Sequence, residues 1–134
     1  MLANLNYIHI AVATLVYFII GSLWYSLLFG KIWVAILGLV VTEEDKKKMP
    51  QMFATTFVLN FVITFSVACI LHFVQPSSVV GAIKVGLVLG AGLSGTTTAM
   101  SNMYARRPLK LTLIDTGYHI LSICVVSVIL TLWQ

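Results

Sequence analysis

The sequence predicts an all-α membrane protein with four transmembrane helices, and three observations carry this prediction. Hydrophobic residues make up 60% of the 134 residues, and charged residues make up only 9%. Soluble domains contain about 25% charged residues. The charges are also confined to a few short segments, which leaves long apolar stretches between them. A soluble fold of this length could not bury so much apolar surface.

Four of these apolar stretches are long enough to cross a bilayer, for which a helix needs about 20 residues. Helices are expected because four short segments cannot close a barrel, and an open sheet edge is not tolerated in lipid. The first stretch lacks a positively charged leading segment and exceeds a signal-peptide core in length, so we expect it to be retained. Residues 1–134 then form one four-helix transmembrane domain, with spans at about 7–29, 52–73, 81–103 and 109–133.

The basic residues predict the orientation of the chain. Seven of the eight lie in the segments that follow spans one and three or at their flanks, and only Lys84 lies elsewhere. The positive-inside rule makes both segments cytoplasmic and places both termini outside. The net charge of +4 is therefore a topology signal, and no nucleic-acid partner is expected. Four of the basic residues are expected to contact cytoplasmic headgroups: Lys31, Arg106, Arg107 and Lys110.

The connections between the spans predict two antiparallel hairpins. Residues 31–41 form an apolar segment that is too short to span, so we expect a short cytoplasmic interfacial segment after helix 1. Thr42, with an acid three residues later, predicts a helix N-cap, and Pro50 suits the first turn of span two. Tight turns at residues 75–78 and 106–108 make each pair of spans that they join antiparallel neighbours.

A stripe of small residues follows one face of span three. Such a stripe lets another helix approach closely in a membrane. We expect Gly86, Gly90 and Ser94 to mediate helix packing and self-association. Residues 90–95 also fit the G-x-G-x-x-G pattern, which indicates nucleotide binding only between a strand and a helix, so we interpret them as close packing. The stripe recurs every four residues: Ala82, Gly86, Gly90, Ser94, Thr98 and Asn102.

A polar layer is predicted in the cytoplasmic half of the spans. Asp115 and His119 lie one turn apart in span four, and every other span places polar side chains at similar depth. A charged Asp facing lipid would cost a few kcal/mol, so such residues usually face an interior or a wet cavity. The layer is either a binding or proton site, or a structural group in which Asp115 neutralises a nearby basic residue. Its predicted members are Asp115, Tyr118, His119, Trp24, Tyr25, Asn60, Thr56 and Ser101, with Thr97 and Ser122 beside them.

The histidines raise a lesser alternative. His9 and His72 both lie near the outer surface, and facing histidines can hold a haem or a metal. No third ligand accompanies them, so no cofactor is predicted, and a haem through His9, His72 or His119 is kept only as an alternative. The sequence contains no H-E-x-x-H motif, P-loop or plausible Ser-His-Asp set, so it does not favour an enzyme.

Three blocks carry a family resemblance: SLWYSLLFGKIW (residues 22–33), GLVVTEED (38–45) and RRPLKLTLIDTGYHI (106–120). On these blocks the chain resembles, over essentially its whole length, the small bacterial membrane proteins of domain of unknown function 1761. One departure is an extra valine between Leu39 and Thr42. The resemblance implies four helices in the bacterial cytoplasmic (inner) membrane and no established activity. The family pattern is matched by Leu23, Trp24, Tyr25, Ser26, Phe29, Gly30, Lys31 and Trp33, by Thr42, Glu43, Glu44 and Asp45, and by Arg107, Pro108, Leu109, Gly117, Tyr118 and His119.

Three hypotheses about function follow from these patterns. The first is a self-associating membrane protein whose polar layer binds or passes a small solute or a proton. The second is a non-catalytic accessory subunit of a larger membrane complex, since almost no mass lies outside the spans. The third is a haem-binding or redox membrane protein. The expected partners are the lipid bilayer and either further copies of the chain or the subunits of a membrane complex.

Overall fold

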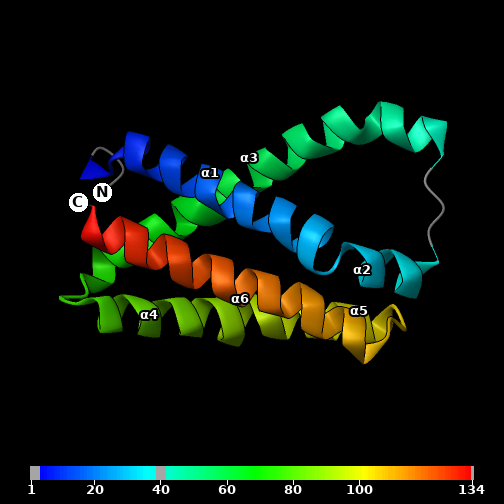
Figure 1. Ribbon diagram of the computed structural model, residues 1–134. Coiled ribbons are helices and arrows are strands. Elements are labelled where there is room, and N and C mark those ends of the chain that lie inside the picture. The colour runs from blue at the N-terminus through cyan, green and yellow to red at the C-terminus, as the bar shows by residue number, and fades with distance from the viewer. Residues whose placement is uncertain (1–3, 39–41, 134) are drawn as a thin grey trace.

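The computed structural model of the chain describes residues 4–38 and 42–133, and none of these residues forms a strand. Four helices are long and apolar enough to cross a membrane, as the sequence predicts (Figure 1). The extra valine before Thr42 lies outside the described residues. The elements in chain order are α1 (Tyr7–Leu23), the π-helical η2 (Trp24–Leu28), α2 (Gly30–Leu37), α3 (Glu43–Val74), α4 (Val79–Leu87), the π-helical η3 (Val88–Gly95), α5 (Thr96–Tyr104) and α6 (Leu109–Leu132).

The starts of α1 and α3 are both set by side-chain caps. The Asn6 side chain accepts hydrogen bonds from the backbone N–H groups of Ile8 and His9. Thr42 and Asp45 form a reciprocal capping box, which confirms the N-cap predicted from the sequence. Because α3 begins at this box, Pro50 lies inside the helix, and the prediction that it occupies the first turn of span two was wrong. The first turns of α3 are instead the charged residues 43–48.

The helix α6 is central to the packing. It contacts α1, α3, α4, η3 and α5, and Figure 1 shows it running alongside α4 and α5. The helix α3 packs against α1 and α6 rather than along α4, although a tight turn joins it to α4. The spans predicted as antiparallel neighbours are thus joined at their turn, but they do not pack along their length. The turn fixes only the ends of the two helices, and the small-residue face of α4 is occupied by α6.

The stripe of small residues is the surface through which α4 and η3 meet α6. A Cβ added to Gly86 would lie 2.7 Å from the Cα of Cys124, and one added to Gly90 would lie 3.0 Å from the Cα of Ile120. Only glycine allows two helix backbones to approach this closely. By contrast, Gly92 has no atom within 4 Å of such a Cβ. The stripe is thus covered by the same chain and is not left free for a second copy.

The π-helical segment η3 explains how a four-residue repeat stays on one face. In an α-helix, each step of four residues rotates about 40° beyond a full turn, so the stripe would drift away from α6. The wider π-type turns of residues 88–95 contain more residues per turn and reduce this drift. As a result, Ala82 near the start of the stripe and Asn102 at its end are both buried.

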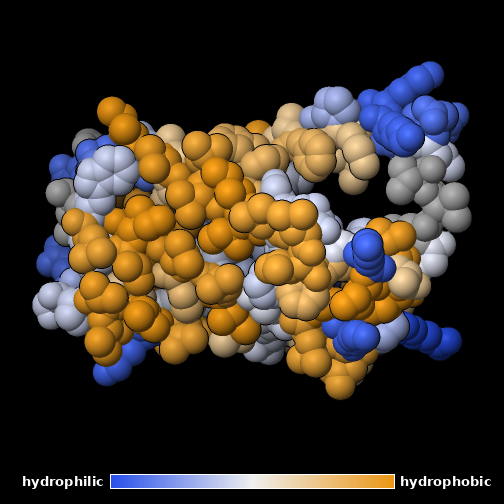
Figure 2. Space-filling view, in the orientation of Figure 1, coloured by the Kyte–Doolittle hydropathy of each residue, from blue (hydrophilic) through white to orange (hydrophobic). Residues whose placement is uncertain are grey.

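The two ends of the molecule differ. We call the end that holds Asn6, the turn at residues 75–78 and Trp133 the terminal end. We call the end that holds α2, the start of α3 and the turn at residues 105–108 the basic end. The rings of Phe18 on α1 and Phe57 on α3 are in contact, and residues 49–59 of α3 are all exposed. Figure 2 shows a hollow between this half of α3 and α2.

Candidate functional site

Asp115 on α6 is the centre of a polar group in the half of the molecule near the basic end. The hydroxyl of Tyr25 donates to Asp115 Oδ1 at 2.6 Å. The amide of Asn102 donates to Asp115 Oδ2 at 3.5 Å and to the hydroxyl of Thr112 at 3.2 Å. The side chain of Asp115 is half-buried, whereas Asn102 is buried. Both carboxyl oxygens are therefore held by neutral donors from η2 and α5.

His119 lies one turn further along α6 and has its own tyrosine partner. Its Nδ1 shares a 2.6 Å hydrogen bond with the hydroxyl of Tyr17, a residue with no exposed surface. The ring of Tyr118 meets the rings of Tyr17 and Tyr25 edge-on, at centroid distances of 5.5 and 5.4 Å. Tyr118 thus connects the two pairs, Tyr25–Asp115 and Tyr17–His119, which we call the tyrosine pairs.

Two glycines and a π-helical turn make room for the tyrosine pairs. A Cβ on Gly21 would lie 2.7 Å from the Tyr118 hydroxyl, and a Cβ on Gly117 would lie 3.2 Å from the ring of Trp24. The indole N–H of Trp24 donates to the backbone carbonyl of Ile114 at 3.0 Å. Trp24 and Tyr25 are consecutive residues of η2, and both reach α6. Turns of the π type frequently occur at functional sites.

The structure brings together most, but not all, of the residues predicted for the polar layer. Asp115, Tyr118, His119, Trp24 and Tyr25 meet as described above. Asn60 and Ser122 are buried: the Asn60 side chain interacts with Tyr118, and the Ser122 hydroxyl has no hydrogen-bond partner among the described residues. The other three residues are exposed. Thr56 donates to the backbone carbonyl of Met52, Thr97 donates to that of Leu93, and Ser101 lies at the surface of α5.

Three members of the polar group were not assigned to it by the sequence reasoning: Tyr17, Asn102 and Thr112. Tyr17 could have been found, because Tyr17, Gly21, Trp24 and Tyr25 follow the spacing of one helical face. Asn102 was noticed only as the last member of the small-residue stripe. The stripe faces α6, so its final member necessarily faces the first turns of α6, where Asp115 lies.

The polar group has no ionic partner among the described residues. In residues 4–38 and 42–133, the one ion pair joins Lys46 to Glu43 at 3.6 Å, on the surface of α3. Arg106, Arg107, Lys110 and Lys31 are all exposed at the basic end. The interpretation of Asp115 as a partner of a basic residue therefore has no support in these contacts. Asp115 is held by hydrogen bonds from uncharged groups alone.

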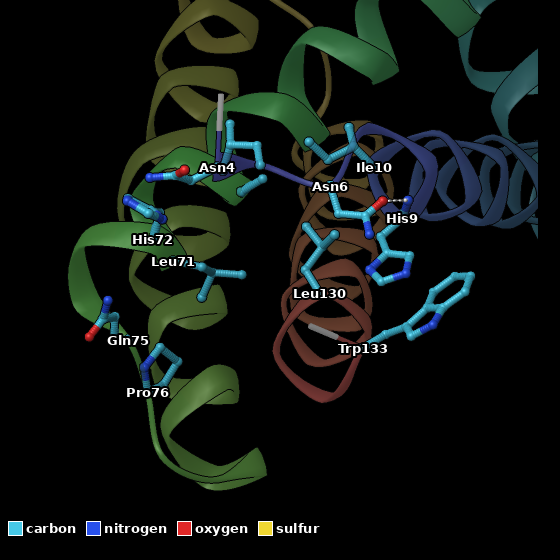
Figure 3. A pocket seen from close by; sticks show the side chains of 12 residues that line it. Asn4, Asn6, His9, Ile10, Leu71, His72, Gln75, Pro76, Leu130 and Trp133 are labelled. Atoms are coloured by element: carbon cyan, nitrogen blue, oxygen red, sulfur yellow. Dashed lines mark hydrogen bonds between the residues drawn. The ribbon is translucent and has the colours of Figure 1, made fainter. Parts of the chain in front are cut away.

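A cavity of about 480 Å³ opens at the terminal end, away from the polar group. His9 and His72 both line it, from α1 and α3 (Figure 3). No group of three metal-ligating side chains occurs in the part of the chain that the structure describes. His119, the third candidate for a haem ligand, lies apart from this cavity in the tyrosine pairs.

Comparison with known proteins identifies the family. Residues 8–131 match the family described as protein of unknown function DUF1761. The chain belongs to this family. The match spans all four long helices and both tyrosine pairs, so it confirms the resemblance that the sequence blocks carry. No curated protein and no solved structure matches the chain.

Proposed function

We propose that this member of the DUF1761 family is an integral membrane protein that takes up a proton, or a small protonated solute, at Asp115 and His119. The observation that carries the proposal is that Asp115 has neutral hydrogen-bond donors but no basic partner among the described residues. At about 1.5 Å per residue, it lies about 9 Å along α6 from Leu109, within the apolar part of the molecule.

A bare carboxylate at this depth is unfavourable. Its cost in a membrane is a few kcal/mol unless a proton or a cation compensates the charge. The hydrogen bonds from Tyr25 and Asn102 hold the carboxyl group in place without neutralising it. The site therefore has an unfilled requirement for one positive charge. A proton fulfils it directly, and the imidazole of His119 one turn away is a second group that can bind a proton.

Access to the site is expected from the basic end only. At the terminal end, the cavity of about 480 Å³ is lined by Ile10 and Leu71, with exposed fractions of 1% and 2%, and no member of the tyrosine pairs lines it. At the basic end, the N-terminal half of α3 diverges and leaves the hollow seen in Figure 2. With the basic end in the bacterial cytoplasm and both termini outside, uptake would proceed from the cytoplasm. The belt of apolar surface between two polar ends in Figure 2 supports this placement in the membrane.

The test is infrared spectroscopy of the lipid-reconstituted protein across pH. We expect a carboxyl band that appears on protonation, is absent in Asp115→Asn, and is retained in Glu44→Gln, a control acid that is exposed on α3. A pH-sensitive dye in the solution that faces the basic end then reports protons bound after a small pH jump, and we expect Asp115→Asn to bind fewer protons than the wild type. If the infrared signal of Asp115 remains that of a carboxylate, and adding protons or small cations does not change it, the site does not bind a proton or a protonated solute.

The orientation has its own test. In a background with Cys69→Ala and Cys124→Ala, a cysteine at Ser77 should react with a membrane-impermeant thiol reagent added outside the cell. A cysteine at Ala105, in the turn at the basic end, should react only after the membrane is opened. The reverse pattern would place the basic end outside and would reverse the direction of uptake.

A second candidate is a role as a subunit of a larger membrane assembly. The N-terminal half of α3 (residues 43–59), which we call the projecting half, favours it, because Met52, Phe53 and Leu59 are 62%, 54% and 58% exposed. A second copy or another subunit would cover these side chains. Gentle native extraction distinguishes the two candidates, since a particle containing one copy and no other protein would rule out the assembly.

A further inference from the structure

We propose that the cavity at the terminal end is a binding site for a quinone or quinol ring. This site is separate from Asp115 and His119, and the inference does not depend on the proton site. The cavity of about 480 Å³ lies within the range of small-molecule sites, which is about 300–1,000 Å³. It lies between α1, the end of α3 and the end of α6, and its lining reaches from Asn6 to Trp133.

The described residues of the lining carry hydrogen-bonding groups but no Asp, Glu, Lys or Arg. Besides the indole N–H of Trp133, the polar side chains among them are carboxamides and imidazoles. A charged ligand would therefore enter without a counter-charge, which is costly in a partly buried site. The ligand that fits is uncharged. The polar side chains are Asn4, Asn6, His9, His72 and Gln75.

The floor of the cavity is apolar and one wall is flat. Ile10, Leu71 and Leu130 line it and are almost fully buried, so the body of the ligand must be apolar. The imidazole of His9 stacks on the indole of Trp133, with ring centroids 3.9 Å apart and an angle of 21° between the planes. A flat aromatic wall favours a planar ring as the ligand.

His9 also has an unfilled hydrogen bond. Its Nδ1 is buried and has no partner within residues 4–38 and 42–133. Buried polar atoms without partners are rare, and a ligand commonly supplies the missing bond. The neighbouring Asn6 uses its carboxamide oxygen to cap α1, so the NH₂ group is what it can offer to a ligand.

The two imidazoles lie on different walls. Figure 3 shows His9 with Asn6 and Trp133 on one side, and His72 with Leu71 and Asn4 on the other. A neutral imidazole has one donor and one acceptor nitrogen. Such a pair can donate to the two carbonyls of a quinone and can equally accept from the two hydroxyls of a quinol. Exposed apolar side chains next in sequence to the two histidines, Ile8 and Phe73, offer a prenyl tail an apolar surface.

The experiment is a fluorescence titration of the full chain in lipid nanodiscs with a 1,4-benzoquinone that carries one short prenyl tail. Trp133 lines the cavity, so binding should quench its emission in a saturable manner. The variant Trp133→Phe should lose the saturable component, and its remaining tryptophans report quenching by quinone dissolved in the lipid. Thr55→Ala, exposed at the other end of the molecule, is the control and should bind as the wild type does.

The histidines are tested by substitutions that preserve shape or hydrogen bonding. His9→Phe keeps a ring against Trp133 but removes both nitrogens, so we expect affinity to fall about tenfold, and His72→Phe should have a similar effect. His9→Gln restores a donor and an acceptor and should bind within about threefold of the wild type. Thermal melting followed by circular dichroism verifies that each variant is folded, and the His9→Gln comparison remains informative if His9→Phe does not fold.

Three results would overturn the proposal. Quenching that never saturates, or that is the same in Trp133→Phe, means that no quinone occupies the cavity. Saturable binding that is unaffected by both histidine substitutions means that the quinone binds elsewhere. A haem spectrum that forms on adding haem and disappears in His9→Phe and His72→Phe would assign the cavity to a haem instead.

Discussion

The terminal half and the basic half of this molecule are built from the same long helices but are held together differently. In the terminal half, apolar side chains pack together around the inner end of the cavity, and Val67, Leu71, Val126 and Leu130 are all at most 7% exposed. In the basic half, the interior is formed by the tyrosine pairs, which are held by hydrogen bonds of 2.6 Å. The first half depends on close packing, and the second depends on directed polar contacts.

The divergence of α3 accounts for the difference. Near the terminal end, α3 packs against both α1 and α6. Beyond the contact between Phe18 and Phe57, its residues are exposed, so α3 does not cover the basic half. In lipid, the absence of this helix removes van der Waals contacts but does not expose apolar groups to water, so its energetic cost is tolerable. The polar group therefore lies in the half that α3 covers least, whereas the cavity of about 480 Å³ lies in the other half.

The largest expected effect tests the close packing of the terminal half. Gly86→Leu would place a side chain where even a Cβ lies 2.7 Å from the α6 backbone. We expect a loss of about 3 kcal/mol in the free energy of unfolding, or failure to fold, measured by denaturant titration in detergent. Gly92→Leu is the matched control, because Gly92 has open space, and it should change stability by less than about 0.5 kcal/mol. Equal losses in both variants would show that α4 does not meet α6 through this face.

The second effect compares the two halves along a single helix. Leu71→Ala removes a side chain that is 2% exposed, and Leu59→Ala removes one that is 58% exposed, both on α3. We expect a loss of about 2 kcal/mol for Leu71→Ala from the cavity it creates, and a much smaller loss for Leu59→Ala. The measurement is the same denaturant titration. A large loss for Leu59→Ala in the native membrane but not in detergent would instead reveal a partner that covers the projecting half of α3.

The third effect concerns the hydrogen bonds of the basic half. Tyr17→Phe leaves Nδ1 of His119 without its partner in a buried position, and we expect a loss of about 1 kcal/mol. Tyr25→Phe should cost less in stability, because Asp115 is partly exposed and retains the amide of Asn102. A double-mutant cycle of Tyr25→Phe with Asp115→Asn measures the coupling of that pair. Zero coupling would show that the 2.6 Å contact contributes nothing to stability, and the tyrosine pairs would lose their role in holding the basic half.

The sequence predicts the four long helices well because the charge-free stretches and the cap residues that define them are local features of the chain. Charge-free stretches fix the four long helices, and Thr42 with Asp45 fixes the start of α3. Asp115 and His119 could be singled out because titratable residues are rare within apolar helices. Each of these features depends on residues that lie close together in the chain.

The remaining features depend on packing partners that lie far apart in the chain. The glycine stripe of α4 predicts a close contact, but it does not say whether the other helix is α6 or a second copy. The π-type turns η2 and η3 leave no pattern that we could recognise, yet η3 keeps the stripe directed at α6. Pro50 was misplaced because a proline suits either the first turn of a helix or an exposed segment where a lost hydrogen bond is tolerated.

The smallest expected effect tests whether the projecting half of α3 is held by local interactions. Its first turns have no described tertiary contacts, so the capping box of Thr42 and Asp45 should be a main determinant of their helicity. For Thr42→Ala we expect a loss of about 0.5 kcal/mol in the free energy of unfolding. The effect on local opening should be larger, and it is measured as faster amide hydrogen exchange over residues 43–48. Exchange in α6 should not change, because the box touches none of its contacts. If exchange over residues 43–48 stays slow, something other than the cap protects them, and a partner covering the hollow becomes the better explanation for the helicity of this half.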